Sequence, residues 1–191
     1  MRSLLIVTAI GGAIVLLASP AAAQRRVAQV PAEGMWGVGG SIGAAGPSDA
    51  SLQNGFDFAG NIEKYLTQRF SLRGQLGVTS WDIQGRGFGG SITPFFADAN
   101  AVYNWEGGFV HPYVTGGVGL YHYNASETGT QDRSDTKPGL NFGGGAELFF
   151  NRRTTMTGEI TYHKVGAFES PLTTFQDGSF WRFGIGVKRY F

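Results

Sequence analysis

The sequence predicts an all-β fold, an eight-stranded antiparallel up-and-down β-barrel, and three observations support this prediction. From residue 35 onward, apolar residues alternate with small or polar residues, and a period of two is typical of strands. Many of the expected strands have 10 to 13 residues, whereas globular strands usually have about 5 or 6. The connections between the strands are alternately short and long. A tilted strand needs about 9 to 11 residues to cross a bilayer, so these lengths favour a transmembrane β-barrel.

The first 23 residues have the layout of a secretory signal peptide. Arg2 precedes an uncharged stretch over residues 4–18, and the alanines at 21–23 provide a small-residue cleavage site. The uncharged stretch has 15 residues, fewer than the about 20 that a membrane-spanning helix needs. We therefore expect a signal peptide over residues 1–23, Sec-type export and cleavage near Ala23. A short polar tail over residues 24–33 and one barrel domain over residues 34–191 should follow.

Each expected strand carries one apolar face and one small or polar face. In the last strand, Trp181 and Phe183 lie on the apolar face, and Arg182 and Gly184 lie on the other. Because successive side chains of a strand point to opposite faces, this pattern describes a sheet with two different environments. The eight strands are expected over residues 35–45, 56–65, 70–81, 92–104, 109–123, 140–150, 154–164 and 180–191.

The connections sort by length onto the two ends of the expected barrel. Three of them, residues 66–69, 105–108 and 151–153, have 4, 4 and 3 residues. The other four have 10, 10, 16 and 14 residues. Short turns at one end and long loops at the other are typical of barrels in bacterial outer membranes. The long loops are expected over residues 46–55, 82–91, 124–139 and 165–178.

Alternation alone does not say which face points outward, because a secreted soluble ligand-binding barrel would turn its apolar face inward. The small and polar face suits the crowded interior of an eight-stranded barrel. Aromatic residues also gather near strand ends, as in the two belts at bilayer interfaces. The main candidates for membrane-interface residues are Trp36, Tyr103, Phe150, Tyr162, Trp181 and Phe191. The two belts should further include Tyr65, Phe70 and Phe109 at the short-turn end, and Phe56, Trp81, Phe95 and Tyr123 at the long-loop end.

Charged residues on the inward face are expected to form a polar network that fills the lumen. Isolated buried charges are very costly, so acids and bases inside the barrel should pair. The near balance of the whole chain, with 15 basic and 14 acidic residues, agrees with such pairing. The alternative interpretation is a narrow, gated ion path. The predicted interior network contains Asp57, Glu63, Arg73, Asp98, Glu147, Glu159, Arg182 and Lys188.

Three features resemble the small outer-membrane β-barrel superfamily, which includes the transmembrane domain of outer-membrane protein A. The first is the signal end formed by the alanines at 21–23. Residues 111–119 read His-Pro-Tyr-Val-Thr-Gly-Gly-Val-Gly, and the chain ends in Phe191 after alternating apolar residues. The resemblance covers residues 34–191. It implies an outer-membrane location in a Gram-negative envelope, contact with outer-membrane lipids, and recognition of the last strand by the barrel-insertion machinery. Arg189 departs from the pattern, since that position is usually apolar or aromatic.

Composition excludes several classes of function. A net charge of +1 gives no basic excess for nucleic-acid binding. The absence of Cys excludes disulfides, Cys-ligated zinc and thiol catalysis. The three histidines, His111, His122 and His163, lie on separate expected strands without close metal-ligand spacing. We therefore expect neither a metal nor a cofactor.

The sequence as a whole predicts a monomeric, non-enzymatic barrel with a structural or surface-interaction role. Narrow porin-like conduction is the first alternative. A lipid A-modifying enzyme is another, because a lipid A deacylase uses a His, a Ser and an acid on a similar barrel. Here His163 lies near Glu159 and a loop with Ser170, but Lys-Val-Gly rather than Ser-Asn follows the His. The long loops over residues 124–139 and 165–178 are the expected surface for partners.

Overall fold

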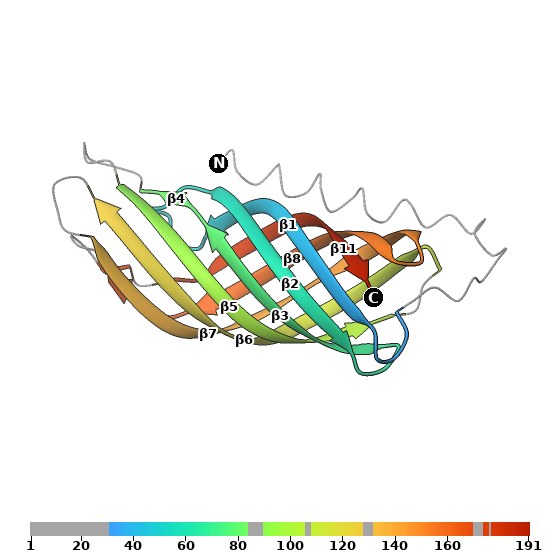
Figure 1. Ribbon diagram of the computed structural model, residues 1–191. Helices are drawn as coiled ribbons and strands as arrows, with labels where there is room; N and C mark the ends of the chain where they lie inside the picture. Colours follow the sequence, from blue (N-terminus) through green and yellow to red (C-terminus); the bar gives the residue numbers. More distant parts are fainter. Residues whose placement is uncertain (1–30, 84–89, 106–107, 128–131, 170–173, 176) are drawn as a thin grey trace.

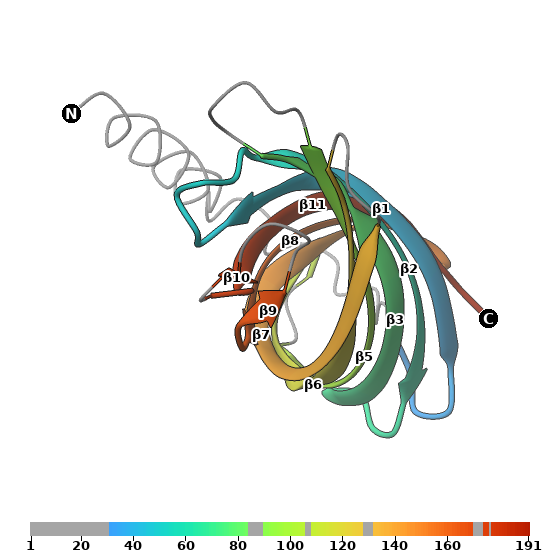
Figure 2. The same ribbon diagram turned by 90° about the vertical axis from the view of Figure 1, so that its left-hand side faces the viewer.

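The computed structural model describes residues 31–83, 90–105, 108–127, 132–169, 174–175 and 177–191. These residues form a closed antiparallel barrel of eight long strands (Figures 1 and 2), which confirms the predicted fold class. No helix in the described part of the chain is long and apolar enough to cross a membrane. The expected signal peptide over residues 1–23 and the tail as far as residue 30 lie outside the described residues.

The strands follow one another around the barrel in an up-and-down order. The sheet runs β3-β2-β1-β11-β8-β7-β6-β5, and β5 pairs with β3 to close it. Short β4 follows β3 and pairs with the start of β5, while β9 and β10 form a separate hairpin. The strands are β1 Trp36–Pro47, β2 Gly55–Tyr65, β3 Phe70–Thr79, β4 Trp81–Asp82, β5 Gly90–Asn104, β6 Val110–Glu127, β7 Arg133–Asn151, β8 Thr154–Val165, β9 Phe168–Glu169, β10 Thr174–Phe175 and β11 Phe180–Tyr190.

The first and last barrel strands meet along a seam that depends on glycine. Their register runs from Gly37 opposite Tyr190 to Pro47 opposite Phe180. A Cβ at Gly43 would collide with the carbonyl oxygen of Phe183. Glycine therefore lets the two backbones approach closely enough for the ladder that closes the barrel.

The apolar face of the barrel points outward. Phe56 is 76% exposed and Leu76 is 67% exposed, and many other large apolar side chains of the strands are also exposed. Soluble monomers rarely expose apolar patches of more than a few hundred Å². A band of this kind around a closed barrel is the lipid-facing surface of a transmembrane barrel, and it argues against a soluble ligand-binding barrel.

Strand structure extends furthest into two of the expected long loops. Residues 124–139 were expected as a loop, but β6 continues to Glu127 and β7 begins at Arg133, with Ala125 opposite Arg133. The hairpin of β9 and β10 lies within the expected loop over residues 165–178. The loop predictions were wrong here because a backbone ladder can continue where both faces meet water and apolar alternation stops.

The interior has three layers rather than polar side chains throughout. A buried apolar cluster, here called the upper aromatic layer, lies toward the long-loop ends of the strands and contains Trp81, Tyr121, Tyr123 and Phe180 among others. A lower aromatic layer of Tyr65, Phe149 and Tyr190 lies toward the short-turn ends, with Met35 packed against it. The charged residues lie between these layers. The belt prediction was therefore wrong for Tyr65, Trp81 and Tyr123, because each is buried in the lumen.

Candidate functional site

The central layer contains a chain of alternating acids and bases. Lys188 Nζ lies 2.6 Å from Glu147 Oε1 and 2.6 Å from Glu63 Oε2. Arg73 Nε lies 2.9 Å from Glu63 Oε2, and its Nη1 lies 2.5 Å from Glu159 Oε2. The chain Glu147–Lys188–Glu63–Arg73–Glu159 thus ties five strands together across the lumen, and each base contacts two acids.

Hydroxyl groups complete the hydrogen bonding of the three carboxylates in this chain. Tyr190 donates to Glu147, and Tyr113 donates to Glu159 over 2.8 Å. Ser71 Oγ donates to Glu63 over 2.5 Å. Buried ion pairs offset the cost of desolvation only when hydrogen bonds satisfy the remaining polar atoms. The chain is therefore a structural network whose members hold one another in place.

The remaining three predicted interior charges lie outside this chain. Arg182 Nη2 pairs with Asp57 Oδ1 at 2.7 Å, and Thr79 donates to the other oxygen of Asp57 over 3.1 Å. Asp98 accepts a hydrogen bond from Asn100 Nδ2 over 2.5 Å. Within the described residues, Asp98 has no basic nitrogen within ion-pair distance.

The lumen is therefore not balanced in charge. All eight predicted residues lie on the inner side of the barrel, and they comprise five acids and three bases. The pairing is not one to one, because Lys188 and Arg73 each contact two carboxylates. Residue counts over the whole chain conceal this local excess of negative charge.

Little open space remains among these charges. An interior cavity of about 20 Å³ lies between Arg73, Glu159, Arg182 and their neighbours. A buried water needs at least about 10–15 Å³ of such volume. The cavity has room for about one water molecule and is much smaller than a continuous aqueous pore.

His163 belongs to the upper aromatic layer. It is 1% exposed and stacks on Phe180 with ring centroids 4.6 Å apart. Its Nδ1 shares a hydrogen bond of 2.8 Å with the hydroxyl of Tyr121. Ser170, the other member of the possible catalytic pair, lies outside the described residues. The environment of His163 is that of a packed core side chain, since burial restricts access by a lipid substrate.

The lower aromatic layer covers the opposite end of the charged layer. Phe149 and Tyr190 stack with centroids 5.9 Å apart, and the hydroxyls of Tyr65 and Tyr190 lie 3.2 Å apart. His111 packs on Phe149 at 4.7 Å. Because Tyr190 also donates to Glu147, this layer is bonded directly to the ion-pair chain. Within the described residues, no group of three or more His, Cys, Asp or Glu side chains could hold a metal ion.

Most of the predicted interface aromatics lie on the outer surface. Trp36, Tyr103, Phe150, Trp181 and Phe191 are exposed, and Tyr162 is half-buried. The ring centroids of Tyr162 and Trp181 lie 4.7 Å apart. Trp105 packs edge-on against Tyr103 at 5.1 Å and is also exposed. Sequence reasoning missed Trp105 because it follows the strand, although a Trp directly after a strand end is itself a sign of the interface.

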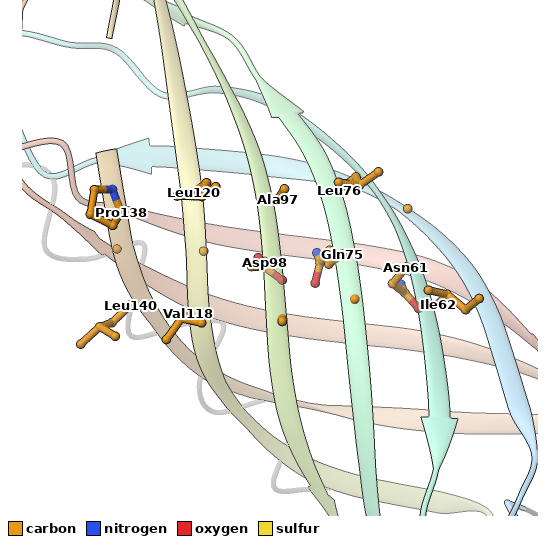
Figure 3. A pocket seen from close by; sticks show the side chains of 15 residues that line it. Asn61, Ile62, Gln75, Leu76, Ala97, Asp98, Val118, Leu120, Pro138 and Leu140 are labelled. Carbon is orange, nitrogen blue, oxygen red and sulfur yellow. The ribbon is translucent and has the colours of Figure 1, made fainter. Parts of the chain in front are cut away.

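A shallow apolar groove of about 960 Å³ runs over the outer surface of β2, β3, β5, β6 and β7 (Figure 3). Exposed side chains such as Ile62, Leu76 and Leu140 border it, and small residues such as Gly74 and Ala97 form its floor. In a bilayer, acyl chains fill such a groove, so it forms part of the lipid-facing surface.

Comparison with known proteins agrees with this architecture. The family model described as "Outer membrane protein beta-barrel domain" matches residues 12–191. No curated protein matches the chain.

Solved structures of three outer-membrane proteins are similar in fold. Neisserial surface protein A (NspA) is 16% identical, with a TM-score of 0.61, over 84% of this chain and 99% of that chain. OprG from Pseudomonas aeruginosa is 13% identical, with a TM-score of 0.61, over 84% and 97%. Ail, the attachment invasion locus protein of Yersinia pestis, was solved in complex with the heparin analogue sucrose octasulfate. It is 15% identical, with a TM-score of 0.55, over 83% and 99%. These likenesses show a shared fold, and the family match over nearly the whole length shows that this chain belongs to the outer membrane protein beta-barrel domain family.

Proposed function

We propose that this protein is a non-conducting, non-enzymatic anchor in the outer membrane that presents its long-loop end to partners outside the cell. The observation that carries the proposal is the layered lumen. Two aromatic layers lie on either side of the ion-pair chain, and the cavity within the charged layer holds about 20 Å³. Eight strands enclose just enough interior for side chains to fill, so the fold supports a structural role better than conduction.

The extension formed by the outer parts of β6 and β7 is the best candidate for the interaction surface. It is held by side-chain contacts to β9. Arg133 pairs with Glu169, and Glu169 N donates to Asp135 Oδ2 over 3.4 Å. Lys137 Nζ lies 3.0 Å from the same carboxylate oxygen. A paired ladder with such contacts offers a partner a preformed surface, which lowers the entropy lost on binding.

The chemistry of this extension favours a polar and near-neutral partner. A shallow pocket of about 250 Å³ lies on it, lined by hydroxyl and amide side chains with one acid and one base. Ail binds a polyanionic heparin analogue, but Arg133 and Lys137 here are each paired with an acid. A strongly sulfated glycan is therefore a poorer match than an uncharged saccharide or a peptide with hydrogen-bonding groups.

Planar-bilayer recording tests whether the lumen is closed. The refolded protein should show no steady conductance, while a sixteen-stranded porin inserted under the same conditions provides the positive control. A steady single-channel current from the wild-type protein would favour the porin-like alternative.

Cysteine labelling tests which end faces outward, because the chain has no Cys of its own. The variant Ser126→Cys places a thiol near the tip of β6, and Thr67→Cys places one in a short turn. A membrane-impermeant maleimide applied to intact cells should label the first variant and leave the second unlabelled. Labelling of both in lysed cells controls for reactivity, and the reverse result on intact cells would contradict the proposed orientation.

A further inference from the structure

Arg189 is a basic residue on the lipid-facing surface of the last barrel strand. It is exposed on β11, opposite Val38 of β1 and Thr154 of β8. The apolar side chains of Val38 and Val187 beside it are 49% and 56% exposed. Within the described residues, Arg189 forms no ion pair. A charge beside acyl chains is costly, so a negative group from the membrane would stabilise this arginine.

Two interface aromatics fix the depth of Arg189 and of a second base, Lys64. The backbone of Phe191 is hydrogen-bonded to that of Trp36, and Lys64 lies opposite Trp36 on the next strand. The guanidinium carbon of Arg189 lies 6.0 Å from the centre of the Phe191 ring. Lys64 Nζ lies 4.6 Å from the centre of the Trp36 ring. Exposed aromatics at strand ends lie at the level of the lipid headgroups, so both positive charges lie where phosphate groups occur.

The turn beside Arg189 adds further positive charge. Arg152 and Arg153 are exposed between β7 and β8, and Tyr190 N donates to Arg153 O over 2.8 Å. Neither arginine forms an ion pair with another described residue. In the described part of the chain, the exposed acid at this end is Glu33. Positive charge therefore exceeds negative charge here, which favours an anionic headgroup over a zwitterionic one.

We infer that this surface binds an anionic phospholipid, with Arg189 on the phosphate group and Lys64 at the flank of the headgroup. The guanidinium fork of an arginine matches the geometry of a phosphate group. Neighbouring strands lie about 4.8 Å apart, so Arg189 and Lys64, two strands apart, flank a surface about 10 Å wide. A phospholipid presents a negative headgroup and apolar chains together, whereas a soluble anion presents only the first. In outer-membrane barrels the short turns face the periplasm, so the lipid belongs to the leaflet on that side. Neither the long loops nor the closed lumen forms part of this site.

Fluorescence quenching by brominated lipids tests the site. Replacement of Trp105 and Trp181 by Phe leaves Trp36 as the exposed tryptophan, because Trp81 is buried in the lumen. The barrel is refolded into phosphatidylcholine vesicles that contain brominated phosphatidylglycerol or, at the same mole fraction, brominated phosphatidylcholine. Phosphatidylglycerol should bind beside Trp36 at least about fivefold more tightly, since each basic residue near an anionic lipid contributes about this factor. Equal quenching by the two lipids would overturn the inference.

Two variants separate binding at Arg189 from a general attraction of the barrel for anionic lipids. Arg189→Gln removes the charge and should lower the preference for phosphatidylglycerol about fivefold. Lys164→Gln removes an exposed base near the long-loop end of β8, opposite the exposed Leu140, and should keep the full preference. A preference that persists in Arg189→Gln would place the phosphate elsewhere and overturn the inference. An equal loss in Lys164→Gln would show a general charge effect and overturn it as well.

Lys64→Gln and a salt titration keep the inference testable if Arg189→Gln fails to refold. Lys64→Gln should also lower the preference for phosphatidylglycerol, because this charge flanks the same headgroup. In the protein with both bases, the preference should fall severalfold between about 0.1 M and about 1 M NaCl, since exposed charges are screened over this range. A preference that neither the Lys64→Gln change nor the salt reduces would show that these charges do not hold the lipid, which would overturn the inference.

Discussion

At the scale of single residues, Lys188 is one of the two lumen cations that each contact two acids. It contacts both Glu63 and Glu147 at 2.6 Å and is 2% exposed. Lys188→Met keeps most of the volume but leaves two buried carboxylates with less compensation. We expect a loss of about 3–5 kcal/mol in the free energy of unfolding, measured by urea titration in lipid vesicles. Lys64→Met, at a half-exposed position, should change it by less than about 0.5 kcal/mol. Similar losses in both variants would contradict the central role of Lys188.

The facing of the eight lumen charges was predictable from period-two alternation, but their partners were not. Arg73 on β3 contacts Glu63 on the neighbouring strand β2, because the register sets the two residues directly opposite each other. Arg73 also meets Glu159, which is 86 positions away in sequence. Contacts across a lumen depend on the curvature and closure of the barrel, and local alternation contains no information about either.

At the scale of elements, the seam between β1 and β11 decides whether the barrel closes. Gly43→Ala would place a Cβ against the Phe183 carbonyl oxygen. We expect a loss of at least about 1–3 kcal/mol in stability, with much of the protein failing to reach the folded form on an unheated detergent gel. At the matched control position, Gly40, the nearest atom to an added Cβ is 3.7 Å away. Gly40→Ala should therefore fold normally, and equal folding of the two variants would refute the steric argument.

Among the elements, the strand ends beyond the bilayer were harder to predict from the sequence than the strand cores. Strand cores were predicted within a few residues, since lipid on one side and a filled lumen on the other impose strict alternation. Beyond the bilayer this constraint ends. The ladder between β6 and β7 nevertheless continues to the pair Ala125 and Arg133, which composition alone marked as a loop.

At the scale of the whole molecule, the closed barrel governs electrophoretic migration and the outward apolar band governs solubility. Unheated protein in dodecyl sulfate should migrate faster than boiled protein, because the closed barrel stays compact. It should also precipitate when detergent is removed, since side chains such as Phe56 and Leu76 are exposed. Identical migration before and after boiling, together with solubility in plain buffer, would contradict the membrane assignment.

The sequence by itself determined the fold class, the number of long barrel strands, and which face of each strand meets lipid. The fold class and the strand number follow from the local geometry of a strand, in which side chains alternate and length is matched to the bilayer. The lipid-facing side follows from the small and polar residues of the other face and from the aromatic residues near strand ends. Tertiary structure decided that the aromatic residues Tyr65, Trp81 and Tyr123 line the lumen. It also decided that Arg73 and Lys188 each contact two carboxylates, and that Asp98 lies outside these ion pairs. Such features depend on which distant strands closure brings face to face, and only the assembled barrel defines those neighbours.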